Sequence, residues 1–165
     1  GATPSWTAPD EWAYNAEDML HLISPQPQFR LHAQNDLPVC EKRQKLMAEA
    51  MYIHPDCAAR HQLSEGDIAL IENHRGRTLA GVIITAQVRP DTIVLPTGAW
   101  METRTLPDGK LEIHVNPKVL TPDNGSTSLS QGNPAHTALV RLSRWTGPLP
   151  EITVFNSPVF VPRSR

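Results

Sequence analysis

The sequence predicts a mainly β protein with short helices, in which a small closed barrel is wrapped by loops. Short apolar segments separated by turn residues recur between residues 64 and 100, a spacing typical of barrels and sandwiches. Two of these segments, 68–71 and 82–85, are apolar without clean alternation, as expected for strands buried on both faces. With 165 residues, the chain is long enough for one domain with a core of its own.

The first part of the chain is polar and rich in proline and tryptophan. We interpret residues 1–18 as an extended arm, with Trp6 and Trp12 as anchors that dock onto the domain. Residues 19–23 are predicted to form a strand. Residues 40–51 contain good helix formers and few helix breakers, so a short helix is expected there.

Residues 52–63 are predicted to form an extended pair and then a helical turn, because Pro55 suits the first position of a helix. Turn residues separate a series of predicted strands after this point. One of these strands alternates, which places Leu111, Ile113 and Val115 on one face. The predicted strands are 68–73, 78–86, 92–96, 110–116, 136–145 and 151–155.

Charge and composition argue against several classes of partner. The formal net charge is -2, with acidic and basic residues interspersed. This balance provides no basic patch for nucleic acid or for a membrane surface. No apolar run approaches the roughly 20 residues that a membrane helix needs. The two cysteines, Cys40 and Cys57, suggest no disulfide framework, and we expect reduced thiols.

A dense set of hydrogen-bonding side chains follows the predicted strand at 19–23. The segment from 24 begins with two prolines, which should hold the chain extended. Arg30, His32 and Gln34 alternate, so an extended chain places all three on one face. Arginine is a bidentate donor suited to phosphate, which indicates an anionic ligand for this segment.

A second polar segment, 120–133, also lies between two predicted strands. Gly125 permits a tight turn with positive φ, and the neighbouring amides and hydroxyls could then line one concavity. Such a turn is an anion-binding nest, for which a phosphate or pyrophosphate is the natural ligand. Asp123 could instead face a guanine, whose N–H donors suit a carboxylate. The simplest alternative is an ordinary solvated loop.

These segments carry a resemblance to a known family. "LHLISPQPQFRLHAQND" resembles the Leu-Ser-Pro-x-Pro-x-x-Arg-Leu-His-Ser-Gln segment of the molybdopterin dinucleotide-binding domain of dimethyl sulfoxide reductase family molybdoenzymes. Residues 53–100 resemble the barrel segment of that domain. "HVNPKVLTPDNGSTSLSQG" resembles the signature Asn-Pro-x-x-Leu-Thr-x-Asp-x-Gly-Thr-Ser-x-Leu-x-Gln. Residues 144–150, "RWTGPLP", resemble the branch that reduces biotin sulfoxide, trimethylamine N-oxide and dimethyl sulfoxide.

The resemblance implies a double-psi β-barrel, also called an aspartate decarboxylase-like barrel, over residues 19–156. The arm at 1–18 and a tail at 157–165 would flank it. It also implies a bis(molybdopterin guanine dinucleotide) cofactor with molybdenum. Residues that would face the pterin and phosphate parts of one dinucleotide are Ser24, Arg30, His32 and Gln34. Residues that would line the other contact region are Asn116, Thr121, Asp123, Ser126 and Gln131.

Two positions depart from the family pattern. Ala33 stands where the family usually has serine, which removes one hydroxyl donor. Lys118 replaces the second asparagine of the family's Asn-Pro-Asn. Either a contact made by that asparagine is lost here, or the lysine meets a phosphate instead.

The resemblance implies a domain that has no complete active site of its own. We expect an excised or separately encoded C-terminal domain of a molybdenum oxidoreductase that reduces an S-oxide or N-oxide by oxygen-atom transfer. Its partners would be the N-terminal catalytic domains, in cis or as a separate subunit, and neither nucleic acid nor membrane. The cofactor would carry the chemistry, and this domain would supply binding and orientation. No catalytic residue or metal ligand is expected in the chain.

Three alternatives remain at this stage. A free-standing double-psi barrel could act as a protein- or nucleotide-recognition module without catalysis. A guanine-nucleotide-binding or chaperone-like domain could instead carry the cofactor without catalysing a reaction. His54, Cys57 and His61 fall at i, i+3 and i+7, so they could bind zinc if a fourth group completed the site. The simpler interpretation is a helix start with Cys57 packed inward. Because no secretory signal is visible, the bacterial cytoplasm is favoured over the periplasm, although a twin-arginine signal would lie upstream.

Overall fold

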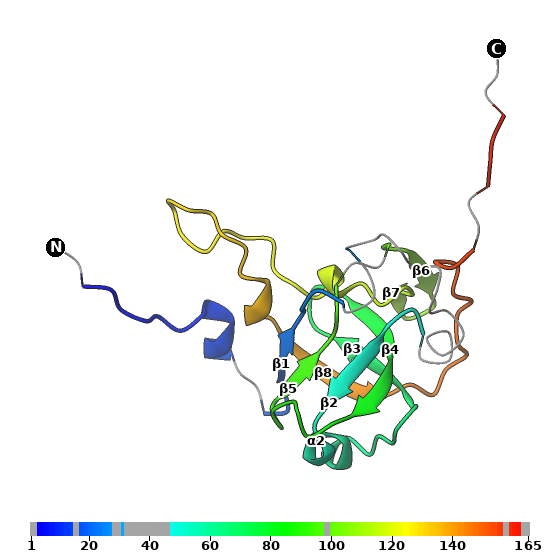
Figure 1. Ribbon diagram of the computed structural model, residues 1–165, viewed down its shortest axis with the longest axis horizontal. Coiled ribbons are helices and arrows are strands. Elements are labelled where there is room, and N and C mark those ends of the chain that lie inside the picture. The colour runs from blue at the N-terminus through cyan, green and yellow to red at the C-terminus, as the bar shows by residue number, and fades with distance from the viewer. Residues whose placement is uncertain are drawn as a thin grey trace.

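The computed structural model describes residues 3–14, 17–27, 31, 47–97, 100–156 and 159–162. Within this part of the chain, six strands close into a barrel (Figure 1) in the order β2-β5-β1-β8-β3-β4, with β2 pairing back onto β4. The ring strands are β1 (Leu20–Ile23), β2 (Ala50–Ile53), β3 (Ile68–Glu72), β4 (Arg77–Ile84), β5 (Thr92–Val94) and β8 (Leu139–Arg144). The expected mainly β barrel is therefore confirmed.

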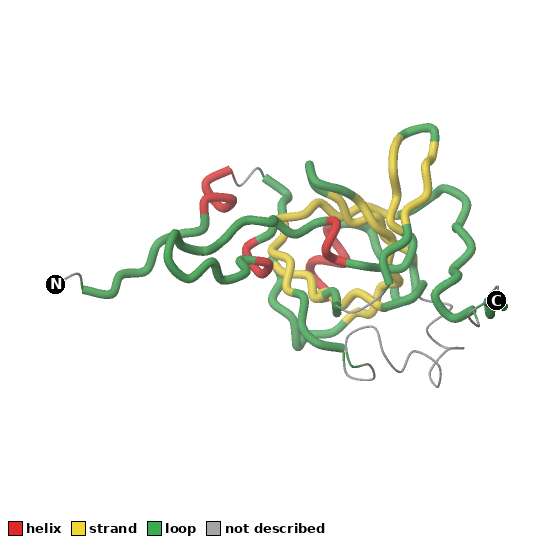
Figure 2. Tube along the Cα trace, turned by 90° about the horizontal axis from the view of Figure 1, so that it is seen from above, coloured by secondary structure: helices red, strands yellow, loops and turns green. Residues whose placement is uncertain are grey.

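The ring mixes parallel and antiparallel neighbours. β1 runs parallel to β5, and β2 runs parallel to β4, while the other ring neighbours are antiparallel. A hairpin of β6 (Thr103–Leu106) and β7 (Gly109–Glu112) joins β4 through the pair Thr78 and Glu112. Figure 2 shows this hairpin protruding from the barrel.

Apolar side chains from every ring strand fill the barrel. Leu22, Met51, Ile71, Leu79 and Ile93 are fully buried, and each comes from a different strand. β4 is buried over five consecutive residues, as expected for a strand with both faces covered. β3 alternates between buried and half-buried positions, which fits the expectation that both faces at 68–71 are buried or nearly so.

The helix at 55–60 confirms one local prediction. α2 (Pro55–Arg60) starts with proline at its first turn. His54 caps it, with Nδ1 accepting a hydrogen bond from the Asp56 N–H at 3.1 Å. Cys57 packs into the core, and burial raises the pKa of its thiol above the ordinary value of 9.0. Among the described residues, no three His, Cys, Asp or Glu side chains are placed to hold a metal ion.

Two sequence-based predictions of secondary structure were wrong, and one strand was missed. The helix expected at 40–51 is contradicted at its end, because Met47 forms a strand bridge and β2 begins at Ala50. Residues 40–46 lie outside the described part of the chain. Residues 151–155 form loop and turn rather than a strand, and β6 was not predicted.

The N-terminal arm is attached to the barrel by a short 3-10 helix, η1 (Asp10–Tyr14). The Trp12 indole N–H donates to the Thr137 carbonyl at 3.1 Å, and the ring lies edge-on to His21. Trp6 is 77% exposed, so only Trp12 acts as an anchor. In Figure 1 both termini extend away from the barrel. No helix in the described residues has the length and apolar character needed to cross a membrane.

Candidate functional site

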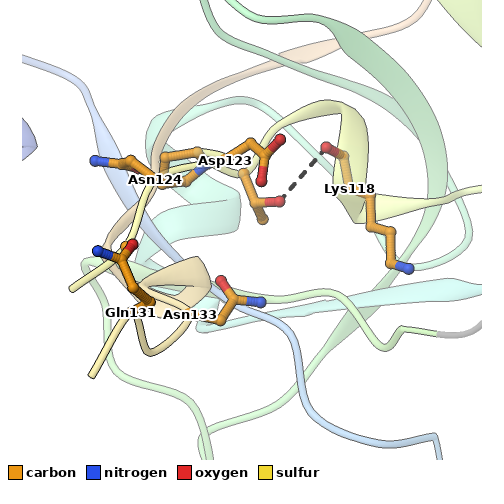
Figure 3. Close-up of a pocket in the computed structure, with 8 residues that line it drawn as sticks. Lys118, Asp123, Asn124, Gln131 and Asn133 are labelled. Atoms are coloured by element: carbon orange, nitrogen blue, oxygen red, sulfur yellow. Dashed lines mark hydrogen bonds between the residues drawn. The ribbon is translucent and has the colours of Figure 1, made fainter. Parts of the chain in front are cut away.

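The second polar segment forms a cavity of ≈ 650 Å³ beside the barrel (Figure 3). In the sequence this segment lies between η3 (Pro117–Val119) and η4 (Ala135–Thr137). In Figure 1 the segment is the yellow loop that reaches away from the ring of strands. The cavity is lined by Lys118, Thr121, Pro122, Asp123, Asn124, Gly125, Gln131 and Asn133. The predicted concavity at 120–133 is therefore present, and Thr121, Asp123 and Gln131 lie on its wall.

A buried carboxylate holds the chain that leads into this cavity. Glu112 is 1% exposed. It accepts hydrogen bonds from the Thr78 hydroxyl at 2.7 Å, the His114 N–H at 2.9 Å and the Asn116 N–H at 2.7 Å. Between these donors Val115 has φ 62, a left-handed conformation that is rare for a β-branched residue. Such strain persists only where the surroundings enforce it, so the carboxylate fixes this turn.

Asn116 continues the same turn by capping η3. Its Oδ1 accepts a hydrogen bond from the Lys118 N–H at 3.0 Å, and its side chain is buried. The Thr121 hydroxyl donates to the Lys118 carbonyl at 3.4 Å, the bond drawn in Figure 3. Asn116 is thus part of the framework behind the cavity, whereas Lys118 and Thr121 reach its wall.

The outer loop closes on itself through Gly125 and Gln131. A Cβ at Gly125 would lie 2.1 Å from the Gln131 Oε1, so the glycine allows this close approach. Gln131, and not Gly125, has positive φ, at 53°. The expected role of Gly125 in the turn was therefore wrong. Among the predicted hydroxyls, those of Thr127 and Ser130 bond to each other at 2.8 Å rather than facing the cavity.

Ser126 lies in the same outer loop, beside the cavity wall rather than on it. Its N–H donates to the Gly132 carbonyl at 2.8 Å, which ties the two arms of the loop together. A ligand contact from Ser126 therefore stays a prediction.

The segment that begins at Ser24 contacts η4, the 3-10 helix that follows the loop at 120–133. The Ser24 N–H donates to Nδ1 of His136 on η4 at 3.2 Å. Among the described residues, the Ser24 hydroxyl is buried without a hydrogen-bond partner. A buried unpaired polar group is costly, and it often marks a place where a ligand supplies the partner. Arg30, His32 and Gln34 lie outside the described residues, so their roles stay predictions.

The chemistry of the cavity suits a polar, partly anionic ligand. It has one cationic side chain, Lys118, one carboxylate, Asp123, and the amides of Asn124, Gln131 and Asn133. Amide groups both donate and accept hydrogen bonds, as a nucleotide requires. The orphaned Ser24 hydroxyl and the polar lining fit a phosphate-bearing cofactor.

Sequence reasoning missed Glu112, Asn133 and His136 as parts of this region. Glu112 and His114 alternate with Leu111 and Ile113, so the pattern placed them on an outward face. Both are buried, because β7 ends at Glu112 and the turn after it folds back over the carboxylate. No pattern in a single sequence predicts that several backbone N–H groups will surround one carboxylate.

Comparison with known proteins places the chain in a family. The model of the family described as "Molydopterin dinucleotide binding domain" matches residues 20–139. Trimethylamine-N-oxide reductase of Haemophilus influenzae is 38% identical over 94% of this chain and 19% of its own length. Biotin sulfoxide reductase of Cereibacter sphaeroides is 38% identical, over 89% of this chain and 20% of its own. The chain thus spans about a fifth of the length of these relatives.

A third relative agrees with this placement, and a solved structure shares the fold. Dimethyl sulfoxide/trimethylamine N-oxide reductase of Rhodobacter capsulatus is 32% identical over 95% of this chain and 20% of its own length. Acetylene hydratase from Pelobacter acetylenicus shares the fold, with a TM-score of 0.63 and 19% identity over 86% of this chain and 21% of that one. The chain belongs to the molybdopterin dinucleotide-binding domain family, as the motifs at 20–36 and 114–132 indicated.

Proposed function

We propose that this chain is one domain of a larger molybdenum oxidoreductase, in which it clamps bis(molybdopterin guanine dinucleotide). The whole enzyme reduces an S-oxide or an N-oxide, as the names of the relatives suggest. The observation that carries the proposal is the polar cavity at 118–133, which lies within the family-matched residues. The other domains act in cis or as a separate subunit, and the bacterial cytoplasm is the proposed compartment.

The residues of this chain bind and orient the cofactor. When bound, the cofactor supplies the metal centre at which oxygen-atom transfer takes place. The Asp123 carboxylate accepts hydrogen bonds from the N–H donors of guanine, while the amides of Gln131 and Asn133 bind the remaining polar atoms. Ser24, whose N–H bonds to His136 on η4, gains a partner for its hydroxyl, which is buried without one among the described residues.

The alternative, a recognition module without catalysis, has less support. It requires a groove for a protein or a free nucleotide, and the relatives at 32–38% identity are reductases. The cavity is polar rather than apolar in its lining, which suits a cofactor better than a protein segment.

A titration of the 165-residue chain with GDP, followed by amide NMR, tests the proposal. We expect shifts at residues 118–133 and near Ser24. ADP should give weaker shifts, because adenine lacks the paired donors that suit Asp123. Asp123→Asn should reduce the preference for GDP over ADP, whereas Asp56→Asn on α2 is the matched control. The absence of any shift at 118–133 would contradict the proposal.

A further inference from the structure

We propose that Lys118 is a phosphate-binding residue that orients the nucleotide, with its phosphates toward η3 and its guanine toward Asp123. This inference rests on the proposed function and adds to it a residue and a direction. Lys118 lines the cavity from η3, and its side chain is exposed, so its ammonium group can reach a ligand there. Its chemistry differs from that of an amide, because an ammonium group adds a full positive charge.

The charges of the cavity are separated along its wall. Lys118 and Asp123 are its charged lining residues. Among the residues that the structure describes, no carboxylate forms an ion pair with Lys118. In Figure 3 the Lys118 ammonium is directed away from the Asp123 carboxylate. The cation is therefore available to a ligand, and it does not serve to neutralise the carboxylate.

The backbone that carries Lys118 is held by the barrel. Its N–H is capped by Asn116, whose own N–H is held by the buried Glu112 carboxylate at 2.7 Å. The carbonyl of the following residue, Val119, lies against Gly76, where an added Cβ would be only 2.7 Å away. The root of the lysine is thus preorganised, and only its flexible stem must be ordered when a ligand binds.

The positions of Lys118 and Asp123 give the cavity a positively charged side and a negatively charged side. Lys118 stands on η3, next to the buried Pro117, whereas Asp123 stands on the outer loop. A ligand with phosphates at one end and base donors at the other satisfies both charges in one orientation. In the reverse orientation the phosphates would face the Asp123 carboxylate, which is repulsive. The phosphate end of the ligand therefore lies nearer the barrel.

The test compares guanosine, GMP and GDP binding to the wild-type chain and to variants at Lys118. Lys118→Asn, which removes the charge and keeps a polar side chain, should weaken GDP binding roughly fivefold and leave guanosine binding unchanged. Lys118→Arg should keep most of the GDP affinity, since it keeps the charge. Lys110→Asn on β7 is the matched control, because it makes the same charge change away from the cavity. The affinity of wild type for GDP should fall as salt rises, and less so in Lys118→Asn.

The outcomes separate this inference from the function on which it rests. If Lys118→Asn weakens guanosine and GDP equally, or weakens neither, the phosphate role of Lys118 is wrong while the domain still binds guanine. If Lys110→Asn weakens GDP as much as Lys118→Asn, the effect is one of net charge, and the assignment is overturned. If the wild-type chain binds none of the three ligands, the proposed function fails, and this inference fails with it.

Discussion

The framework behind the cavity, residues 112–119, is organised around a buried carboxylate, whereas the loop in front of it, residues 123–132, is exposed to solvent. Residues 112–119 surround a carboxylate that is 1% exposed and is satisfied by backbone and hydroxyl donors. Residues 123–132 are exposed, and Leu129 at the loop tip is 95% exposed. The comparison teaches that the site combines a base buried against the barrel with an exposed outer wall that is held by hydrogen bonds within its own loop.

The largest effect is expected at the framework, from Glu112→Ala. The variant leaves the N–H groups of His114 and Asn116 buried without the carboxylate acceptor, while the Thr78 hydroxyl keeps only its bond to the carbonyl of residue 112 at 3.1 Å. We expect the free energy of unfolding to fall by about 3 kcal/mol, as measured by urea denaturation. Glu72→Ala on β3 is the control and should cost less than about 1 kcal/mol. Equal losses in the two variants would mean that the buried carboxylate is not a framework group.

A pair of glycine substitutions compares the two regions directly. In Gly76→Ala the new Cβ meets the Val119 carbonyl oxygen at 2.7 Å, so backbone must shift, and we expect a loss of about 1–3 kcal/mol in unfolding free energy. In Gly125→Ala the nearest atom is Oε1 of the flexible Gln131 side chain, so stability should change by less than about 0.5 kcal/mol. GDP affinity should fall in Gly125→Ala, because Gln131 lines the cavity. A greater loss of stability in Gly125→Ala would reverse the comparison.

Ser24→Ala tests whether the buried Ser24 hydroxyl contributes to stability at the contact with η4. Its hydroxyl is buried without a partner in the described residues, so removing it should leave stability unchanged or raise it by up to about 1 kcal/mol. Thermal unfolding of the wild type and the variant measures this. Ser143→Ala, at an exposed position on β8, is the control. A clear loss of stability in Ser24→Ala would show that the hydroxyl has a structural role.

The smallest effect is expected outside both regions, where Thr153 joins the C-terminal segment to the barrel. The Thr153 hydroxyl donates to Glu102 at 2.7 Å, and this bond, with smaller effects of Arg104 and His114, lowers the pKa of Glu102 below its ordinary value of 4.5. A lowered pKa in the folded state gives stability that is present above 4.5 and is lost as the pH falls through the lowered value.

Thr153→Val therefore removes a stabilising bond whose effect depends on pH. We expect the difference in urea midpoint between wild type and variant to be present near neutral pH and to shrink in acid. The measurement is a series of urea unfolding curves at decreasing pH. A difference that is the same at every pH would mean that the bond to the Glu102 carboxylate does not contribute.

Local patterns in the sequence predicted much of the barrel correctly. β1, β3, β4, β5 and β8 follow apolar segments bounded by turn residues, and Pro55 starts a helix as expected. Each of these signals depends on neighbours in sequence, such as the fixed φ of proline. The cavity at 120–133 was predictable on the same ground, since its donors are close together in the chain.

The errors arose where distant parts of the chain overrode local propensity. Ala50 and Met51 are good helix formers at the end of the expected helix, yet they pair with Gly81 and Val82 of β4, and strand pairing wins. Residues 151–155 alternate as a strand would, yet Ile152 and Val154 pack on the core without strand pairing. Thr153 bonds to His114 and Glu102 instead.

The sequence by itself determined the family, the mainly β class and the polar residues that could bind a dinucleotide, because these depend on residue identity and local spacing. The tertiary structure decided how those residues are used. It buried Glu112 beneath the turn that carries Lys118, and it joined Ser24 to His136 across 112 residues of chain. Such contacts are set by ring closure between strands far apart in sequence, and no local pattern encodes them.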